Sequence, residues 1–82
     1  MKVSESKLKK MLSNLFKVAP EDINDDTSMD TIEKWDSLNH LNLILALESE
    51  FNVILTEENT VEVISYPLIK IVLQEHGLQF TA

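Results

Sequence analysis

Apolar residues recur at intervals of three and four along much of the chain, which is the pattern of amphipathic helices. The first such helix is predicted within residues 5–18, with apolar positions at Leu8, Met11, Leu12, Leu15 and Phe16. Ser4 is a suitable N-cap, and Val3 and Leu8 have the spacing of a hydrophobic staple. Pro20 prevents further extension, because the residue before a proline avoids the α region.

The second helix, predicted over residues 37–51, has more apolar side chains than one core face needs. On a helical wheel these side chains fall into two groups. The group expected to face the core consists of Leu43, Ile44, Leu47 and Phe51. The other group forms an outward strip of Leu38, Leu41 and Leu45, with Glu48 and Ser49 near its far end. A helix that is apolar on two sides is either wholly buried or built to meet a partner.

Two shorter helices are predicted in the last third of the chain. The apolar run from Val53 to Leu55 could form a strand, but the sequence offers no second strand to pair with it. Thr56 is a suitable cap for a helix over residues 57–64. Ser65 can cap a fourth helix in which Pro67 lies in the tolerated first turn. The inward side of this fourth helix is expected to consist of Leu68, Ile69, Val72 and Leu73.

These elements predict an all-α four-helix bundle with a long first loop and a short third helix, in a single domain over residues 1–82. One glycine and two prolines argue against a turn-rich β fold. The long loop, residues 19–36, is acidic and is expected to contact the core through Ile23, Met29 and Ile32. The absence of cysteine excludes disulfides and cysteine metal sites, so any thiol chemistry requires a thiol from a cofactor.

Charge is unevenly distributed along the chain, whose net charge is −7. Residues 1–19 contain five lysines and one glutamate, whereas residues 20–82 contain two lysines and thirteen carboxylates. An acidic surface disfavours nucleic acid and anionic membranes and favours basic partners, although acidity can also serve solubility alone. With no apolar run long enough to span a bilayer and no signal-like start, we expect a cytoplasmic protein.

Three polar residues near the start of the second helix, Asp36, Ser37 and His40, suggest a hydrolase at first sight. Ser37 and His40 are three residues apart and therefore share a helix face. Nucleophilic catalysis also needs a third group that orients the base, and an oxyanion hole. A domain this small has no deep cleft to hold them. We expect no enzyme activity, and we expect His40 to be partly buried at the core edge.

The acidic loop has oxygen-bearing residues at the spacing of an EF-hand, namely Asp22, Asn24, Asp26, Ser28, Asp30 and Glu33. Thr27 occupies the position where that loop needs a glycine for its sharp turn. Pro20 also ends the preceding helix early. We therefore expect no dedicated metal site.

Ser37 itself has two interpretations. A serine at a helix start is usually an N-cap. Alternatively, Asp36 is the cap and Ser37 points outward, where an attached phosphodiester would lie on free amides at the positive end of the helix dipole. The spacing of the residues leaves both interpretations open.

The segment Trp35-Asp36-Ser37-Leu38, with the later Ala46-Leu47-Glu48 and Glu50-Phe51, resembles the phosphopantetheine-attachment signature of acyl carrier proteins. The likeness extends over the whole chain in length, acidity, the long first loop and the Ser-capped fourth helix. It implies that Ser37 receives 4′-phosphopantetheine from coenzyme A through a separate phosphopantetheinyl transferase. The thiol of this arm would carry an acyl or aminoacyl group as a thioester. Asp36 would assist transferase and metal-ion engagement.

The resemblance also implies partners. Leu38, Leu41, Leu45 and Glu48 match the family's recognition surface for the transferase and for acyl-loading and acyl-processing enzymes. The interior could shelter an acyl chain between Leu43, Leu47, Phe51, Ile54 and Ile64, with plain core packing as the alternative for each. We expect a monomeric carrier in fatty-acid, polyketide or another dedicated biosynthesis.

Some positions depart from the pattern of fatty-acid carriers. Asn39 and Asn42 occupy positions where those carriers often have acids, and Trp35 precedes the aspartate. Both features favour a specialised, stand-alone carrier. An aminoacyl or peptidyl carrier, and an unmodified helical module that binds a partner through its leucines, are the alternatives.

Overall fold

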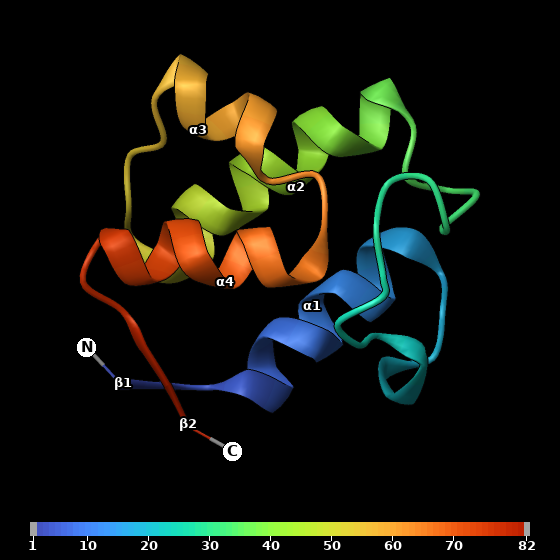
Figure 1. The fold of residues 1–82 in the computed structure, drawn as a ribbon, viewed down its shortest axis with the longest axis horizontal. Helices are drawn as coiled ribbons and strands as arrows, with labels where there is room; N and C mark the ends of the chain where they lie inside the picture. The colour runs from blue at the N-terminus through green and yellow to red at the C-terminus, as the bar shows by residue number, and fades with distance from the viewer. Residues whose placement is uncertain (1, 82) are drawn as a thin grey trace.

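The computed structural model describes residues 2–81 and confirms the all-α bundle. Within these residues the elements are β1 (Lys2–Ser4), α1 (Glu5–Phe16), the 3-10 helix η1 (Pro20–Asp22), α2 (Ser37–Phe51), α3 (Glu57–Glu62), α4 (Tyr66–Glu75) and β2 (Gln79–Thr81). In Figure 1, α1 and α3 lie on opposite sides of the molecule, and the long α1–α2 loop forms one end. None of the helices in this range has the length and apolar content to span a bilayer.

Three helices begin at the side-chain caps that the sequence predicts. Ser4, Thr56 and Ser65 accept hydrogen bonds from backbone N–H groups of the first turns of α1, α3 and α4. At α3 the cap is reciprocal, because the Asn59 side chain accepts from the N–H of Thr56. Each such cap contributes about 1 kcal/mol to helix stability. The helices therefore start where local sequence chemistry places them.

The core lies between α1, α2 and α4. The inward group of α2 is buried as predicted, with Leu43 and Leu47 fully inaccessible. These residues pack with the apolar face of α1 and with Ile69, Val72 and Leu73 of α4. The loop contributes as expected: Ile23 is buried, and Met29 and Ile32 pack against the cluster.

Several expectations for the last third of the chain are wrong. The third helix ends at Glu62, not at residue 64. Ile54 and Ile64 are 83% and 44% exposed, so neither belongs to the interior. Ile54 lies in an extended link, where side chains alternate and its neighbour Leu55 takes the inward direction. Leu68 is also 37% exposed, although Val72, one turn later on the same side of α4, is buried.

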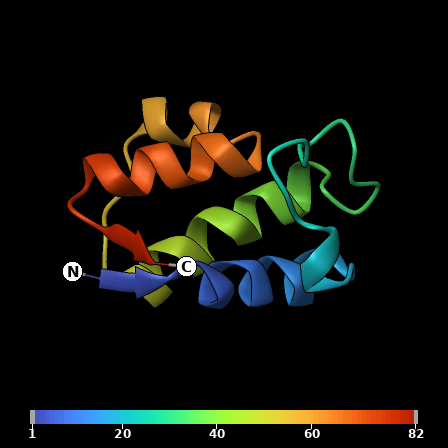
Figure 2. The ribbon, with the colours of Figure 1, turned by 60° about the horizontal axis from the view of Figure 1, so that its bottom comes forward.

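The two ends of the described chain form a parallel strand pair that the sequence did not predict. Val3 of β1 is aligned with Phe80 of β2, and the pairing covers three residues on each strand. Figure 2 shows the two strands side by side next to the start of α1. Val3 is buried and Phe80 packs against the core. The pair ties the segment after α4 back to α1.

Candidate functional site

Ser37 is the first residue of α2, and its side chain is exposed. The N-cap is Asp36, whose Oδ1 accepts a hydrogen bond from the N–H of Asn39 at 2.9 Å. Of the two interpretations left open by the sequence, the structure has Asp36 as the cap. The Ser37 hydroxyl makes no hydrogen bond within residues 2–81 and is free to react.

The backbone around Ser37 suits a negatively charged substituent. The first amides of a helix have no intrahelical acceptor. Asp36 satisfies the amide of Asn39, which leaves those of Ser37 and Leu38 without an acceptor among the described residues. These amides form the positive end of the helix dipole, where a phosphodiester is stabilised. A phosphopantetheine on Ser37 Oγ therefore fits the charge of this helix end.

A buried aromatic contact fixes the loop that leads into Ser37. Trp35 is 2% exposed and stacks on Phe16 of α1 with ring centroids 4.6 Å apart. Its indole Nε1 donates a hydrogen bond to Nδ1 of His40 at 3.1 Å. The other ring nitrogen of His40, Nε2, is 2.6 Å from the carbonyl oxygen of Thr60 in α3. Trp35 thus connects the loop before Ser37 to α1 and, through His40, to α2 and α3.

These contacts assign which ring nitrogen of His40 donates and which accepts. Indole N–H is a donor only, so Nδ1 must accept, and the proton on Nε2 is then donated to Thr60. Both ring nitrogens are engaged, and His40 is half-buried as predicted. His40 is therefore not available as a base for Ser37, which argues against a hydrolase. Nothing in the sequence indicated the Trp35–His40 bond, because its geometry depends on how the helices pack.

Asn39 has a role that the sequence did not reveal. Its Nδ2 donates to the carbonyl oxygen of Lys34 at 2.7 Å, and its Oδ1 accepts from Asn42 Nδ2 at 3.1 Å. A carboxylate in place of Asn39 could accept hydrogen bonds but could not donate one to Lys34. The amide at this position therefore closes the turn before Ser37.

The outward side of α2 has the predicted exposure. Leu38, Leu41 and Leu45, which we call the leucine strip, are 70%, 58% and 58% exposed. Glu48 borders the strip but is half-buried, and its Oε2 accepts a hydrogen bond from the N–H of Leu55 at 2.9 Å. Glu48 thus also holds the link between α2 and α3.

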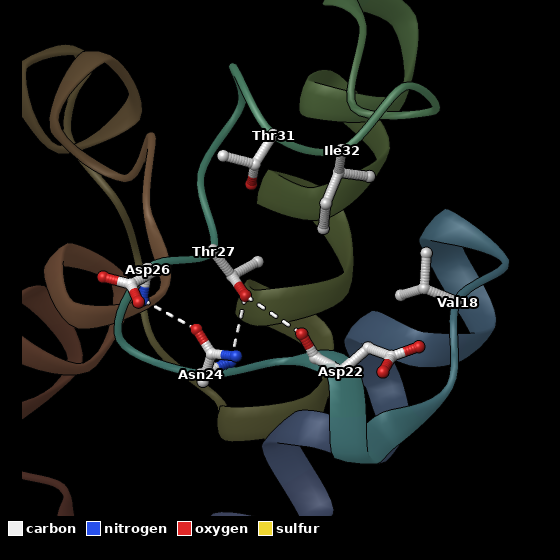
Figure 3. Close-up of a pocket in the computed structure, with 7 residues that line it drawn as sticks. All are labelled: Val18, Asp22, Asn24, Asp26, Thr27, Thr31 and Ile32. Atoms are coloured by element: carbon white, nitrogen blue, oxygen red, sulfur yellow. Dashed lines mark hydrogen bonds between the residues drawn. The ribbon is translucent and has the colours of Figure 1, made fainter.

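The acidic loop has turn geometry rather than the geometry of a calcium loop. Asp22, Asn24 and Asp26 line a cavity of about 280 Å³, shown in Figure 3. Asn24 Oδ1 accepts from the N–H of Asp26, while Thr27 Oγ1 accepts from the N–H of Asn24 and donates to the carbonyl of Asp22. These oxygens serve the loop itself. In the part of the chain that the structure describes, no three acidic, histidine or cysteine side chains are grouped to hold a metal ion.

Comparison with known proteins identifies the family. A family model described as a phosphopantetheine attachment site matches residues 6–64, which is well over half of the chain and includes the start of α2. The comparison with curated proteins gives no significant match. Domains of this family bear covalent 4′-phosphopantetheine, and they interact with phosphopantetheinyl transferases and acyl-processing enzymes. The chain therefore belongs to the phosphopantetheine-attachment family and is a carrier protein that bears this cofactor.

Proposed function

We propose that this protein is an acyl carrier protein with its 4′-phosphopantetheine on Ser37. One observation carries the proposal: Asp36 caps α2, so the exposed Ser37 hydroxyl can be modified without loss of a helix cap. The chain has no cysteine, so the thiol that holds an acyl or aminoacyl group as a thioester comes from the arm. Asp36, next to the attachment point, assists engagement of the transferase and its metal ion.

The leucine strip is the proposed docking surface for the phosphopantetheinyl transferase and for acyl-loading and acyl-processing enzymes. Its three leucines are exposed on the helix that begins with Ser37, so a partner bound there meets the arm directly. Glu48 borders this surface, and one of its carboxylate oxygens is bonded to Leu55. A small apolar patch within an acidic surface suits basic partners that bind briefly and then release the carrier.

The proposed carrier serves a dedicated biosynthesis of the fatty-acid, polyketide or a related type, and the partner enzymes perform the chemistry. Asn39 supports a specialised carrier, because its amide closes the turn before Ser37 in a way that an acid could not. Leu43, Leu47 and Phe51, the remaining candidates for sheltering an acyl chain, pack within the core cluster.

Intact-protein mass spectrometry tests the proposal. The protein is incubated with coenzyme A, magnesium and a broad-specificity phosphopantetheinyl transferase, beside the variants Ser37→Ala and Ser49→Ala. Ser49 is an exposed serine of the same helix and is the matched control. We expect one phosphopantetheine on the wild type and on Ser49→Ala, and none on Ser37→Ala. Unchanged addition to Ser37→Ala would exclude Ser37 as the attachment site. No addition to any form, with a control carrier modified, would favour an unmodified binding module.

A further inference from the structure

We infer that α1 carries a second docking surface, a row of lysines that binds an acidic patch of a partner protein. Lys7, Lys10 and Lys17, with Asn14 between them, recur at intervals of three and four residues. Lys7, Lys10 and Asn14 therefore lie along one side of α1, Lys17 follows as its C-cap, and all four are exposed. We call this row the lysine stripe. The opposite side of α1 is buried in the core through Leu8, Leu12 and Phe16.

The lysines of the stripe form no close ion pair with the carboxylates of the described residues. Within residues 2–81, the ion pairs closer than 4 Å join Glu5 to Lys9 and to Lys70, and none includes a lysine of the stripe. The Nζ of Lys7 lies 5.7 Å from the centre of the Phe51 ring. Like charges three or four residues apart on a helix repel one another. Carboxylates from a partner would relieve this repulsion.

A groove beside the stripe provides a place for such a carboxylate. Its volume is about 330 Å³, and its walls are Lys7, Lys10, Met11 and Asn14 of α1 and Glu50 of α2. The half-buried Met11 offers an apolar surface for the methylenes of an entering glutamate, while Lys7 and Lys10 supply the positive charge. The single carboxylate of Glu50 leaves this pair of lysines with a net positive charge.

The stripe leads from this groove toward the attachment site. In Figure 1, α1 and α2 run in opposite directions, so the carboxyl end of α1 lies near the start of α2. Lys17 directly follows Phe16, and Phe16 stacks on Trp35, two residues before Ser37. A partner held along the stripe would therefore extend toward the helix end that holds Ser37, without using the leucine strip.

The charge of the rest of the protein determines which class of partner can bind the lysine stripe. Residues 20–82 have eleven more negative than positive side chains, counting thirteen carboxylates against two lysines. An extended polyanion such as nucleic acid or an anionic membrane would be repelled by the rest of this surface. A second copy also has a net charge of −7 and is repelled as a whole. A protein with a compact acidic patch avoids both penalties.

A designed peptide makes this inference testable without knowledge of the natural partner. The probe is a synthetic helix with glutamates at positions i, i+3, i+7 and i+10, and the matched peptide has glutamines at those positions. Each is titrated into the ¹⁵N-labelled protein at low salt, and amide shifts are recorded by NMR. We expect saturable shifts in α1 and near Glu50 with the glutamate peptide alone. Salt should weaken them, because exposed charges are screened.

Two double variants with the same net charge separate the stripe from general electrostatics. Lys7→Gln with Lys10→Gln should weaken binding about fivefold, since two exposed ion pairs that each contribute a factor of about two to three multiply to that value. Lys2→Gln with Lys34→Gln changes two exposed lysines outside the stripe, and its affinity for the glutamate peptide should stay within twofold of wild type. Equal weakening by both variants would overturn the inference. So would α1 shifts that appear with protein concentration alone, or stronger binding to phosphatidylglycerol vesicles than to the peptide.

Discussion

Replacement of Trp35 by phenylalanine tests whether the buried contacts of Trp35 hold the loop before Ser37 in place. Trp35 is almost inaccessible, stacks on Phe16 and donates its indole N–H to His40. Phenylalanine can preserve the stacking but has no donor, and it leaves part of the indole volume empty. Nδ1 of His40 would then lose its partner inside the protein.

The expected cost can be worked from these contacts. Loss of one hydrogen bond costs about 1 kcal/mol. Phenylalanine also lacks the five-membered ring of the indole, and the loss of this ring from a packed site adds about 1 to 2 kcal/mol, by analogy with other truncations in protein cores. The free energy of unfolding should therefore fall by about 2 to 3 kcal/mol, a large part of the roughly 4 to 12 kcal/mol typical for this chain length. The Tm should fall by about 10 to 20 °C.

Urea unfolding followed by far-UV circular dichroism measures this change. Tryptophan fluorescence is unsuitable, because Trp35 is the only tryptophan and the variant lacks it. A double-mutant cycle with His40→Ala isolates the hydrogen bond, and we expect a coupling of about 1 kcal/mol. A loss below about 0.5 kcal/mol with additive single changes would refute a structural role for this contact.

Three further expectations concern the attachment turn, the charge pair of α1 and the leucine strip. Asn39→Asp should lower the free energy of unfolding in urea by about 0.5 to 1 kcal/mol, because the donor to Lys34 is lost; unchanged stability would show that the bond contributes nothing. The hydrogen bond from Lys70 lowers the pKa of Glu5 below its ordinary 4.5, so this pair stabilises the fold above that pH and ceases to do so as the pH falls through the lowered value. Lys70→Gln should thus lower the free energy of unfolding in urea near neutral pH, by about 0.5 kcal/mol at most, and should match wild type in strong acid; an equal deficit in acid would contradict this assignment. Leu41→Glu should slow phosphopantetheine transfer about tenfold with under 0.5 kcal/mol change in stability, whereas Ile54→Glu, an equally charged change at an exposed site outside α2, should transfer normally.

The sequence predicted what local chemistry determines. Ser4, Thr56 and Ser65 mark helix starts because their side chains bond amides two or three residues away. The two apolar groups of α2 follow from its own period, and the exposure of the leucine strip agrees with that prediction. The sequence left open whether Asp36 or Ser37 caps α2, because either side chain can reach a free amide of the first turn, and the structure has Asp36 as the cap.

The remaining features depend on contacts between distant segments. The β1–β2 pair joins Val3 to Phe80, and strands of three residues have too little pattern to predict. The Trp35–His40–Thr60 connection depends on where α3 packs. Ile54 and Ile64 lie in links between helices, where no period indicates the direction of a side chain.

The measurement that tests the central claim most directly is tandem mass spectrometry of the phosphopantetheinylated protein, with fragments that separate Ser37 from every other serine. We expect the whole modification on Ser37, the exposed serine at the start of α2. Modification of Ser49 or of any other serine, with Ser37 unmodified, would contradict it.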